Sequence, residues 1–137
     1  AEIYKNTKMG ADSITDLIGH VENEKLRVEM TSELDRYEEL ASRAAKLSRD
    51  RGEEPKEEGA LAKAAVKMSM AVNTMTDSSA SHIAEMMIQG AGMGVTDLRR
   101  AISAEERLEN PDAEAVALAR ETVRFEESSA EKLKAFL

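Results

Sequence analysis

The sequence contains no cysteine, only two histidines and only four aromatic residues. Without cysteine the chain has no disulfide, no thiolate zinc site, no iron–sulfur cluster and no cysteine nucleophile. Two histidines also exclude a metal centre built from several imidazoles. Tyr4, Tyr37, Phe125 and Phe136 are too few to form a platform on which nucleic-acid bases stack. These absences remove several classes of enzyme and of nucleic-acid-binding protein.

Long hydrophobic runs are missing, as is an excess of positive charge. No stretch approaches the roughly 18 apolar residues of a membrane span. The first residues do not show the basic-then-apolar layout of a secretory signal. The 27 acidic and 19 basic residues give a net charge of −8, which repels phosphate backbones. We therefore predict a cytoplasmic protein that binds neither nucleic acid nor a membrane.

The residues that are abundant are those of a helical protein. Ala, Leu, Glu, Lys and Met dominate, whereas β-branched residues and turn dipeptides are scarce. A chain of 137 residues has the size of one domain with one hydrophobic core. We predict a single all-α domain over residues 1–137, without strands.

Apolar residues spaced three and four apart predict four long helices and one short one. The short helix, over about 60–76, follows a charged loop at 51–59 and has the length of a crossover. Two hairpins joined in this way make a four-helix bundle with one long connection. The long helices are predicted over 2–20, over 24–50, from a cap at 77–79 to about 108, and from a turn at 110–112 to the end.

Acidic residues on the apolar faces of these helices are the candidate functional residues. A buried carboxylate is costly unless it is paired, hydrogen-bonded or bound to a metal. Helical spacing places Glu33 and Glu126 among apolar neighbours on two different helices, at nearly the same height in the bundle. We expect these two to face each other. Asp97 lies on a third helix and is expected roughly 10 Å lower.

In this arrangement the chain resembles the ferritin-like superfamily, whose bundles join short hairpins by a crossover and hold two irons at mid-height. The metal motif of that family is a glutamate from each of two helices and a Glu-x-x-His pair from each of the other two. The corresponding stretches here are Glu33-Leu34-Asp35-Arg36 and Glu126-Glu127-Ser128-Ser129, which lack histidine. The inward positions on the other two helices are Gly10 and Gly90. The resemblance implies a ferritin-like four-helix bundle with a short crossover helix, without a complete di-iron motif.

Two interpretations of the inward acids stay open. In the first, Arg36, Tyr37 or serine hydroxyls satisfy the acids, and the protein is a structural or interaction module without a cofactor rather than an enzyme. In the second, Glu33 and Glu126, assisted by Asp97, hold iron or another divalent metal ion.

His82 and Glu85 form a second candidate metal pair. They stand three apart on one helix, a spacing that lets both side chains reach one ion. The alternative is a partly exposed histidine that caps or packs at the helix start.

Methionines are concentrated in the middle third of the chain. Thioethers ligate haem iron or copper, so haem binding through a methionine or His82 is a further functional alternative. Methionine at helical spacing is also adaptable core filler, and a methionine-rich face could form a subunit contact. The clustered residues are Met68, Met70, Met75, Met86, Met87 and Met93.

The stretch Gly90-Ala91-Gly92-Met93-Gly94 has no preceding strand and no Lys-Ser or Lys-Thr ending, so it does not fit a phosphate loop. Three glycines inside a helix cost about 2 to 3 kcal/mol relative to alanine. A compensating reason is therefore expected. It is either close backbone approach at Gly90 and Gly94, or a kink or ligand-sized gap beside Glu126.

Leu118, Phe125 and Phe136 occupy the side of the last helix opposite its main apolar face. Large apolar residues in that position need a cover, because contiguous exposed patches mark interfaces. We expect the crossover helix or a second copy of the chain to provide it. On this ground we predict a homo-oligomer, in the simplest case a dimer.

Overall fold

The computed structural model describes residues 2–56, 59, 63, 66–68, 70–71 and 77–137. Within these ranges the protein is all-α and contains no strand, which confirms the predicted class. None of the helices described there is both long enough and apolar enough to cross a membrane. The elements are α1 (Glu2–Ile18), α2 (Glu24–Asp50), α4 (Ala80–Glu106), α5 (Ala113–Leu133) and the 3-10 turn η1 (Lys134–Phe136).

Side-chain caps begin three of the helices where the sequence predicts their starts. The side chain of Asn23 accepts a hydrogen bond from the backbone of Leu26 at the start of α2. Ser79 and Asp112 do the same at the starts of α4 and α5. Such caps satisfy amide groups that the first helical turn leaves without partners. α2 is followed by Gly52, whose φ of +76° suits a residue without a side chain.

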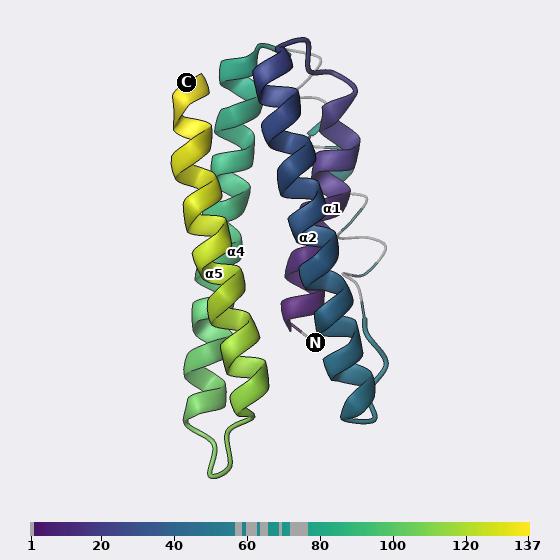
Figure 1. Cartoon of the computed structure of the whole chain (residues 1–137), viewed down its shortest axis with the longest axis vertical. Helices are drawn as coiled ribbons and strands as arrows, with labels where there is room; N and C mark the ends of the chain where they lie inside the picture. Colours follow the sequence, from purple (N-terminus) through teal and green to yellow (C-terminus); the bar gives the residue numbers. More distant parts are fainter. Residues whose placement is uncertain (1, 57–58, 60–62, 64–65, 69, 72–76) are drawn as a thin grey trace.

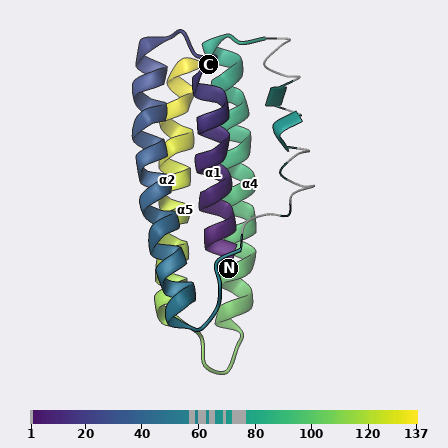
Figure 2. The same cartoon turned by 90° about the vertical axis from the view of Figure 1, so that its right-hand side faces the viewer.

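The helices run side by side as two antiparallel hairpins (Figure 1). α1 pairs with α2, and α4 pairs with α5. α2 ends at one end of the bundle and α4 begins at the other, so the connection between them spans its length (Figure 2). The short helix predicted over 60–76 lies largely outside the described residues. The helix order agrees with one long connection, and the ferritin-like assignment stays a prediction.

The apolar core consists of two clusters along the bundle. The first lies toward the α1–α2 link and includes Leu26, Ile83 and Leu133, while the second includes Leu40 and Leu98. Tyr37 of α2 belongs to the first cluster, and Phe125 of α5 packs against both. Tyr37 and Phe125 contact edge to face, with ring centroids 4.8 Å apart.

The expectation that Leu118, Phe125 and Phe136 need a separate cover is wrong for this bundle. Leu118 is 6% exposed in the second cluster, and Phe125 packs against Tyr37. Phe136 packs against the first cluster. α5 contacts more than one neighbouring helix, so its buried surface is wider than a single apolar stripe. The predicted self-association therefore loses the observation on which it was based.

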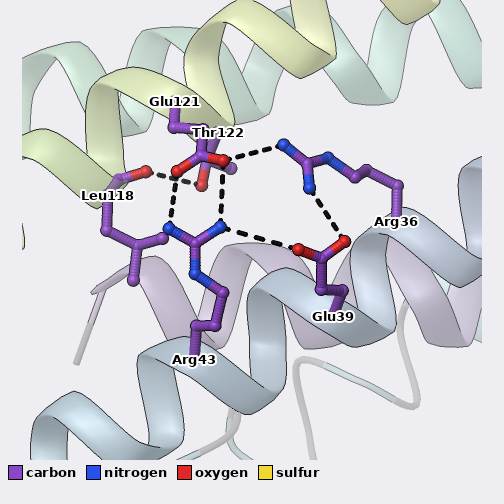
Figure 3. A network of polar contacts seen from close by, with 6 residues as sticks. All are labelled: Arg36, Glu39, Arg43, Leu118, Glu121 and Thr122. Carbon is purple, nitrogen blue, oxygen red and sulfur yellow. Dashed lines mark hydrogen bonds and ion pairs between the residues drawn. The ribbon is translucent and has the colours of Figure 1, made fainter.

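Charged side chains join α2 to α5 on the outside of the bundle (Figure 3). Arg43 donates to both carboxylate oxygens of Glu121, at 2.9 and 2.7 Å. Arg36 donates to Glu121 at 2.8 Å and to Glu39 at 2.8 Å. Paired arginine–carboxylate contacts have a fixed geometry, so this network sets the position of α5 along α2. The two guanidinium groups hold the pKa of Glu121 down at about 2.

Candidate functional site

Glu33 on α2 and Glu126 on α5 are buried inside the bundle, as their helical positions predict. Their exposed fractions are 4% and 2%. The hydroxyl of Tyr37 donates a hydrogen bond to Glu126 Oε2 at 2.9 Å. The hydroxyl of Ser129, about one turn beyond Glu126, donates to Glu33 Oε1. The two carboxylates therefore lie at neighbouring levels of the antiparallel pair α2 and α5.

Glycines on α1 and α4 make room for these side chains. A Cβ atom on Gly10 would lie 2.5 Å from the ring of Tyr37. A Cβ atom on Gly94 would lie 2.5 Å from Glu126 Oε2 and 2.8 Å from Asn6 Nδ2. No real side chain tolerates such distances without displacing its neighbour. At Gly94 the predicted close approach is therefore made by side chains and not by a neighbouring backbone. At Gly90 no atom lies within 4 Å of the Cβ position, so the predicted close approach is not found there.

Several buried oxygen atoms at this place have no hydrogen-bond donor among the described residues. They are Glu33 Oε2, Glu126 Oε1 and Asn6 Oδ1. Asn6 is held through its other amide atom, because Nδ2 donates to the carbonyl of Gly94 at 3.0 Å. Leaving a buried acceptor without a donor costs about 1 to 3 kcal/mol. Three such acceptors at one cavity require donor groups, which water molecules or a bound ligand can supply.

The same residues line a cavity of about 480 Å³ that reaches from the bundle interior to solvent, since Met93 and Asp97 of its wall are exposed. This volume is in the range of small-molecule sites in proteins. The polar part of its wall contains Asn6, Glu33, Tyr37, Glu126 and Ser129. The ligand-sized gap predicted beside Glu126 is confirmed. Much of the remaining wall is methionine and glycine, namely Met9, Met70, Met86, Met87, Met93, Gly10, Gly90 and Gly94.

The cavity is lined mainly by α1 and α4, together with Glu33 and Tyr37 of α2 and with Glu126 and Ser129 of α5. Val66 and Met70 of the connection from α2 to α4 line it. Of the clustered methionines, Met68 is 70% exposed and Met75 lies outside the described residues. The other four line the cavity. Filling the core, as predicted, is therefore only part of what these methionines do.

Asp97 is exposed and lines the same cavity. Its negative charge raises the pKa of Glu126. The expectation that Asp97 lies well below the two glutamates is therefore wrong. The reason is the axial offset of α4, because Gly94 is the α4 residue that faces Glu126 and Asp97 follows it by one turn.

The buried carboxylates bind protons more tightly than ordinary glutamates. Burial raises the pKa of Glu33 from 4.5 to about 7, although the hydrogen bond from Ser129 lowers it. Burial also raises the pKa of Glu126 to about 7, against the lowering effects of Tyr37 and Asn6. Burial and the charges of both glutamates raise the pKa of Tyr37 above its usual range. The phenol of Tyr37 therefore remains a donor, while both glutamates titrate near neutral pH.

His82 and Glu85 lie away from this site. His82 is in the first turn of α4, and its Nδ1 is 4.0 Å from Glu85 Oε2. Neither residue lines the cavity. The structure brings Glu33, Glu126 and Asp97 to one cavity but leaves this pair at the start of α4, with Glu85 exposed and His82 partly buried.

The residues present do not fit the di-iron centre that the ferritin-like resemblance implies. In the described ranges, no group of three or more His, Asp or Glu side chains is placed to hold a metal ion. Where the family has histidines, Arg36 contacts Glu39 and Glu121, and Ser129 donates to Glu33. Of the partners predicted for the inward acids, Tyr37 and a serine are confirmed, and Arg36 is not a partner.

Sequence reasoning missed Asn6 and Met9 on α1 as site residues. Asn6 follows Ile3 by three residues and precedes Gly10 by four, so the same helical spacing that marks an apolar face includes it. A polar residue on that face was the available signal. Nothing in the sequence distinguished Met9 from an ordinary packing residue.

Comparison of the chain with models of protein families, with curated proteins and with solved structures finds no match. The fold and the site together define an all-α bundle with an acidic cavity that opens to solvent.

Proposed function

We propose that the protein is a non-enzymatic binding module of the ferritin-like type, which holds a small organic molecule inside the bundle in place of iron. One observation carries this proposal. Glu33 and Glu126 are almost completely buried, each has an oxygen without a donor among the described residues, and both line one cavity of about 480 Å³.

The wall of the cavity supports a ligand with an apolar body and one polar end. Methionine side chains are flexible and polarisable, so they adapt to ligands of different shape. Pockets that bind small molecules combine mostly apolar walls with a few placed polar groups, often with shifted pKa values. Glu33, Glu126 and Asn6 are those polar groups here.

Glycine substitutions offer a direct test of binding in the cavity. Gly90 lines the cavity and Gly92 does not, and neither has an atom within 4 Å of its Cβ position. We expect Gly90→Leu to fill part of the cavity and Gly92→Leu to leave it open. Both variants should fold, because leucine is a better helix former than glycine.

The probe is 1-hexanol, which has an apolar chain and a hydroxyl donor. A ligand that binds only the folded protein raises its melting temperature. We expect 1-hexanol to raise the melting temperature of the parent protein and of Gly92→Leu, and to have a much smaller effect on Gly90→Leu. The same shift in all three proteins, or no shift in any, would contradict binding in this cavity.

A further inference from the structure

The buried side-chain atoms at the cavity that still lack a hydrogen-bond partner among the described residues are all acceptors. The hydroxyls of Tyr37 and Ser129 already donate to the two glutamates, and Asn6 Nδ2 donates to Gly94. Four buried side-chain atoms lack a partner among the described residues; His82 Nε2 lies away from the cavity, and the three at the cavity are oxygens of Asn6, Glu33 and Glu126. When the two glutamates are ionised, a carboxylate or phosphate ligand would face these oxygens with acceptors only and without a hydrogen bond. A matching ligand is therefore a donor.

The charge of the cavity wall favours a cation. Four acids line it, Glu2, Glu33, Asp97 and Glu126, against one base, Lys5. Lys5 is within 3.8 Å of Glu2, so its charge is balanced by that residue. The whole chain carries a net charge of −8, which attracts cations and repels anions.

Two observations favour an organic cation over a metal ion. The described residues provide no group of three or more ionisable or imidazole ligands for a metal. The methionine-lined part of the cavity provides apolar surface that a bare ion does not use. A primary ammonium group has three donors, as the lysine side chain does. Asn6 and Glu126, which both lie within 3 Å of the Cβ position of Gly94, each carry a free acceptor, and Glu33 offers another in the same cavity.

We infer that the ligand is a small primary alkylamine, bound as its ammonium ion with the nitrogen at Glu126 and Asn6 and the alkyl chain against the methionines. This inference rests on the proposed function and names the chemical class of its ligand.

Binding of an ammonium ion is coupled to loss of a proton from the site. An alkylamine has a pKa similar to that of lysine, about 10.4, and keeps its proton on binding. At pH 6 the two glutamates, with pKa values of about 7, are mostly protonated. The ammonium ion favours a carboxylate, so one glutamate releases its proton to solvent. An uncharged alcohol of the same length releases none.

The test is isothermal titration calorimetry of the full chain at pH 7 with hexylamine, 1-hexanol and hexanoate. These probes share one alkyl chain and differ only in the polar end. We expect hexylamine to bind at least about tenfold more tightly than 1-hexanol, and hexanoate to bind most weakly. Titrations at pH 6 in two buffers with different ionisation enthalpies should show proton release with hexylamine alone.

The variant Glu126→Gln keeps an acceptor for Tyr37 and removes the negative charge. We expect it to weaken hexylamine binding about tenfold and to change 1-hexanol binding less than about threefold. Glu127→Gln is the matched control, because Glu127 is an exposed glutamate on the same helix that pairs with Arg99 at 3.2 Å. This control should bind all three probes like the parent protein.

The outcomes separate this inference from the proposed function. If 1-hexanol binds and hexylamine binds no more tightly, the inference of an amine ligand is overturned and the cavity remains a binding site. The same follows if Glu126→Gln weakens the binding of both probes equally. If none of the three probes binds the parent protein, both are overturned. A third outcome combines three results: Mn²⁺ raises the melting temperature, Glu126→Gln abolishes that rise, and hexylamine does not bind. In that case the site is a metal site and the inference of an amine ligand is overturned.

Discussion

Glu33 and Glu126 combine burial with hydrogen bonds from hydroxyl groups, and burial has the larger effect on their pKa values. A hydrogen bond from Ser129 or Tyr37 favours the ionised form, but it replaces only part of the water that burial removes. The consequence is that the folded protein holds protons that the unfolded chain gives up near pH 4.5. This coupling makes the stability of the bundle depend on pH in an unusual direction.

We predict that the free energy of unfolding falls as the pH rises from about 4.5 to about 7. In that window the folded state binds more protons than the unfolded state, so raising the pH favours unfolding. The expected loss is up to about 3 kcal/mol for each carboxyl. Urea unfolding at pH 5 and pH 7.5 measures it. Glu33→Gln and Glu126→Gln should each remove part of the pH dependence.

The control for this prediction is again Glu127→Gln, which should keep the full pH dependence of the parent protein. Glu121 and Asp112 have pKa values lowered to about 2, so their effect on stability appears below pH 4.5 and has the opposite sign. The two windows are therefore separate. A parent protein that is equally stable at pH 5 and pH 7.5 would show that the two glutamates are not buried in this way.

A second prediction at the residue scale concerns the glycines of α4. Gly94→Ala should lower the free energy of unfolding by about 1 to 2 kcal/mol, because the new methyl group displaces Glu126 and breaks its bond with Tyr37. Gly92→Ala should raise it by about 0.5 to 1 kcal/mol, because alanine favours the helix and meets no atom. Thermal or urea unfolding compares the two variants. Equal effects would mean that Gly94 does not face Glu126.

At the scale of the helices, the arginine–glutamate network joins α2 to α5 at the surface, beside the buried bonds of Tyr37 with Glu126 and of Ser129 with Glu33. Glu121 is partly exposed, so its ion pairs with Arg36 and Arg43 are weakened by solvent. We predict that Glu121→Gln lowers the free energy of unfolding by about 1 kcal/mol at pH 7 in low salt. Glu39→Gln, at a more exposed acid in the same network, should cost less.

This contribution has a defined pH window. The pKa of Glu121 is lowered to about 2, so its stabilising effect is fully present above about 4.5 and is lost as the pH falls through 2. The difference between parent protein and Glu121→Gln should therefore vanish near pH 2 and shrink in high salt. A difference that persists under both conditions would indicate a packing effect instead.

The helices themselves could be predicted closely from the sequence. α2 begins and ends at Glu24 and Asp50, as predicted, because its start carries a capping asparagine and its end is followed by Gly52. α1 ends at Ile18, earlier than the predicted His20, and α5 gives way to a 3-10 turn after Leu133. Helix ends without a strong local signal are the ones that differ.

The contacts between helices could be predicted only in part. The burial of Glu33 and Glu126 follows from spacing along single helices, and it is confirmed. The level of Asp97 and the cover of Leu118 depend on how far each helix is shifted and rotated against its neighbours. Spacing along one helix does not contain that information. The outward contacts of Arg36 were missed for the same reason.

At the scale of the whole molecule, glycine and methionine together explain why the bundle contains a cavity. Glycines on α1 and α4 remove side chains from the interior, and the space beside them is lined by flexible methionines and by two acids, one from α2 and one from α5. A cavity with unpartnered acceptors lowers stability. A bound molecule that fills it and donates to those acceptors recovers this loss.

The most direct test of this account is a crystal structure of the protein grown with hexylamine. We expect electron density for the amine inside the cavity, with its nitrogen within hydrogen-bonding distance of the free oxygen of Glu126 and its chain along Met86, Met87 and Met93. A cavity that contains only water, or that is closed by the surrounding side chains while the amine is absent or bound elsewhere, would contradict it.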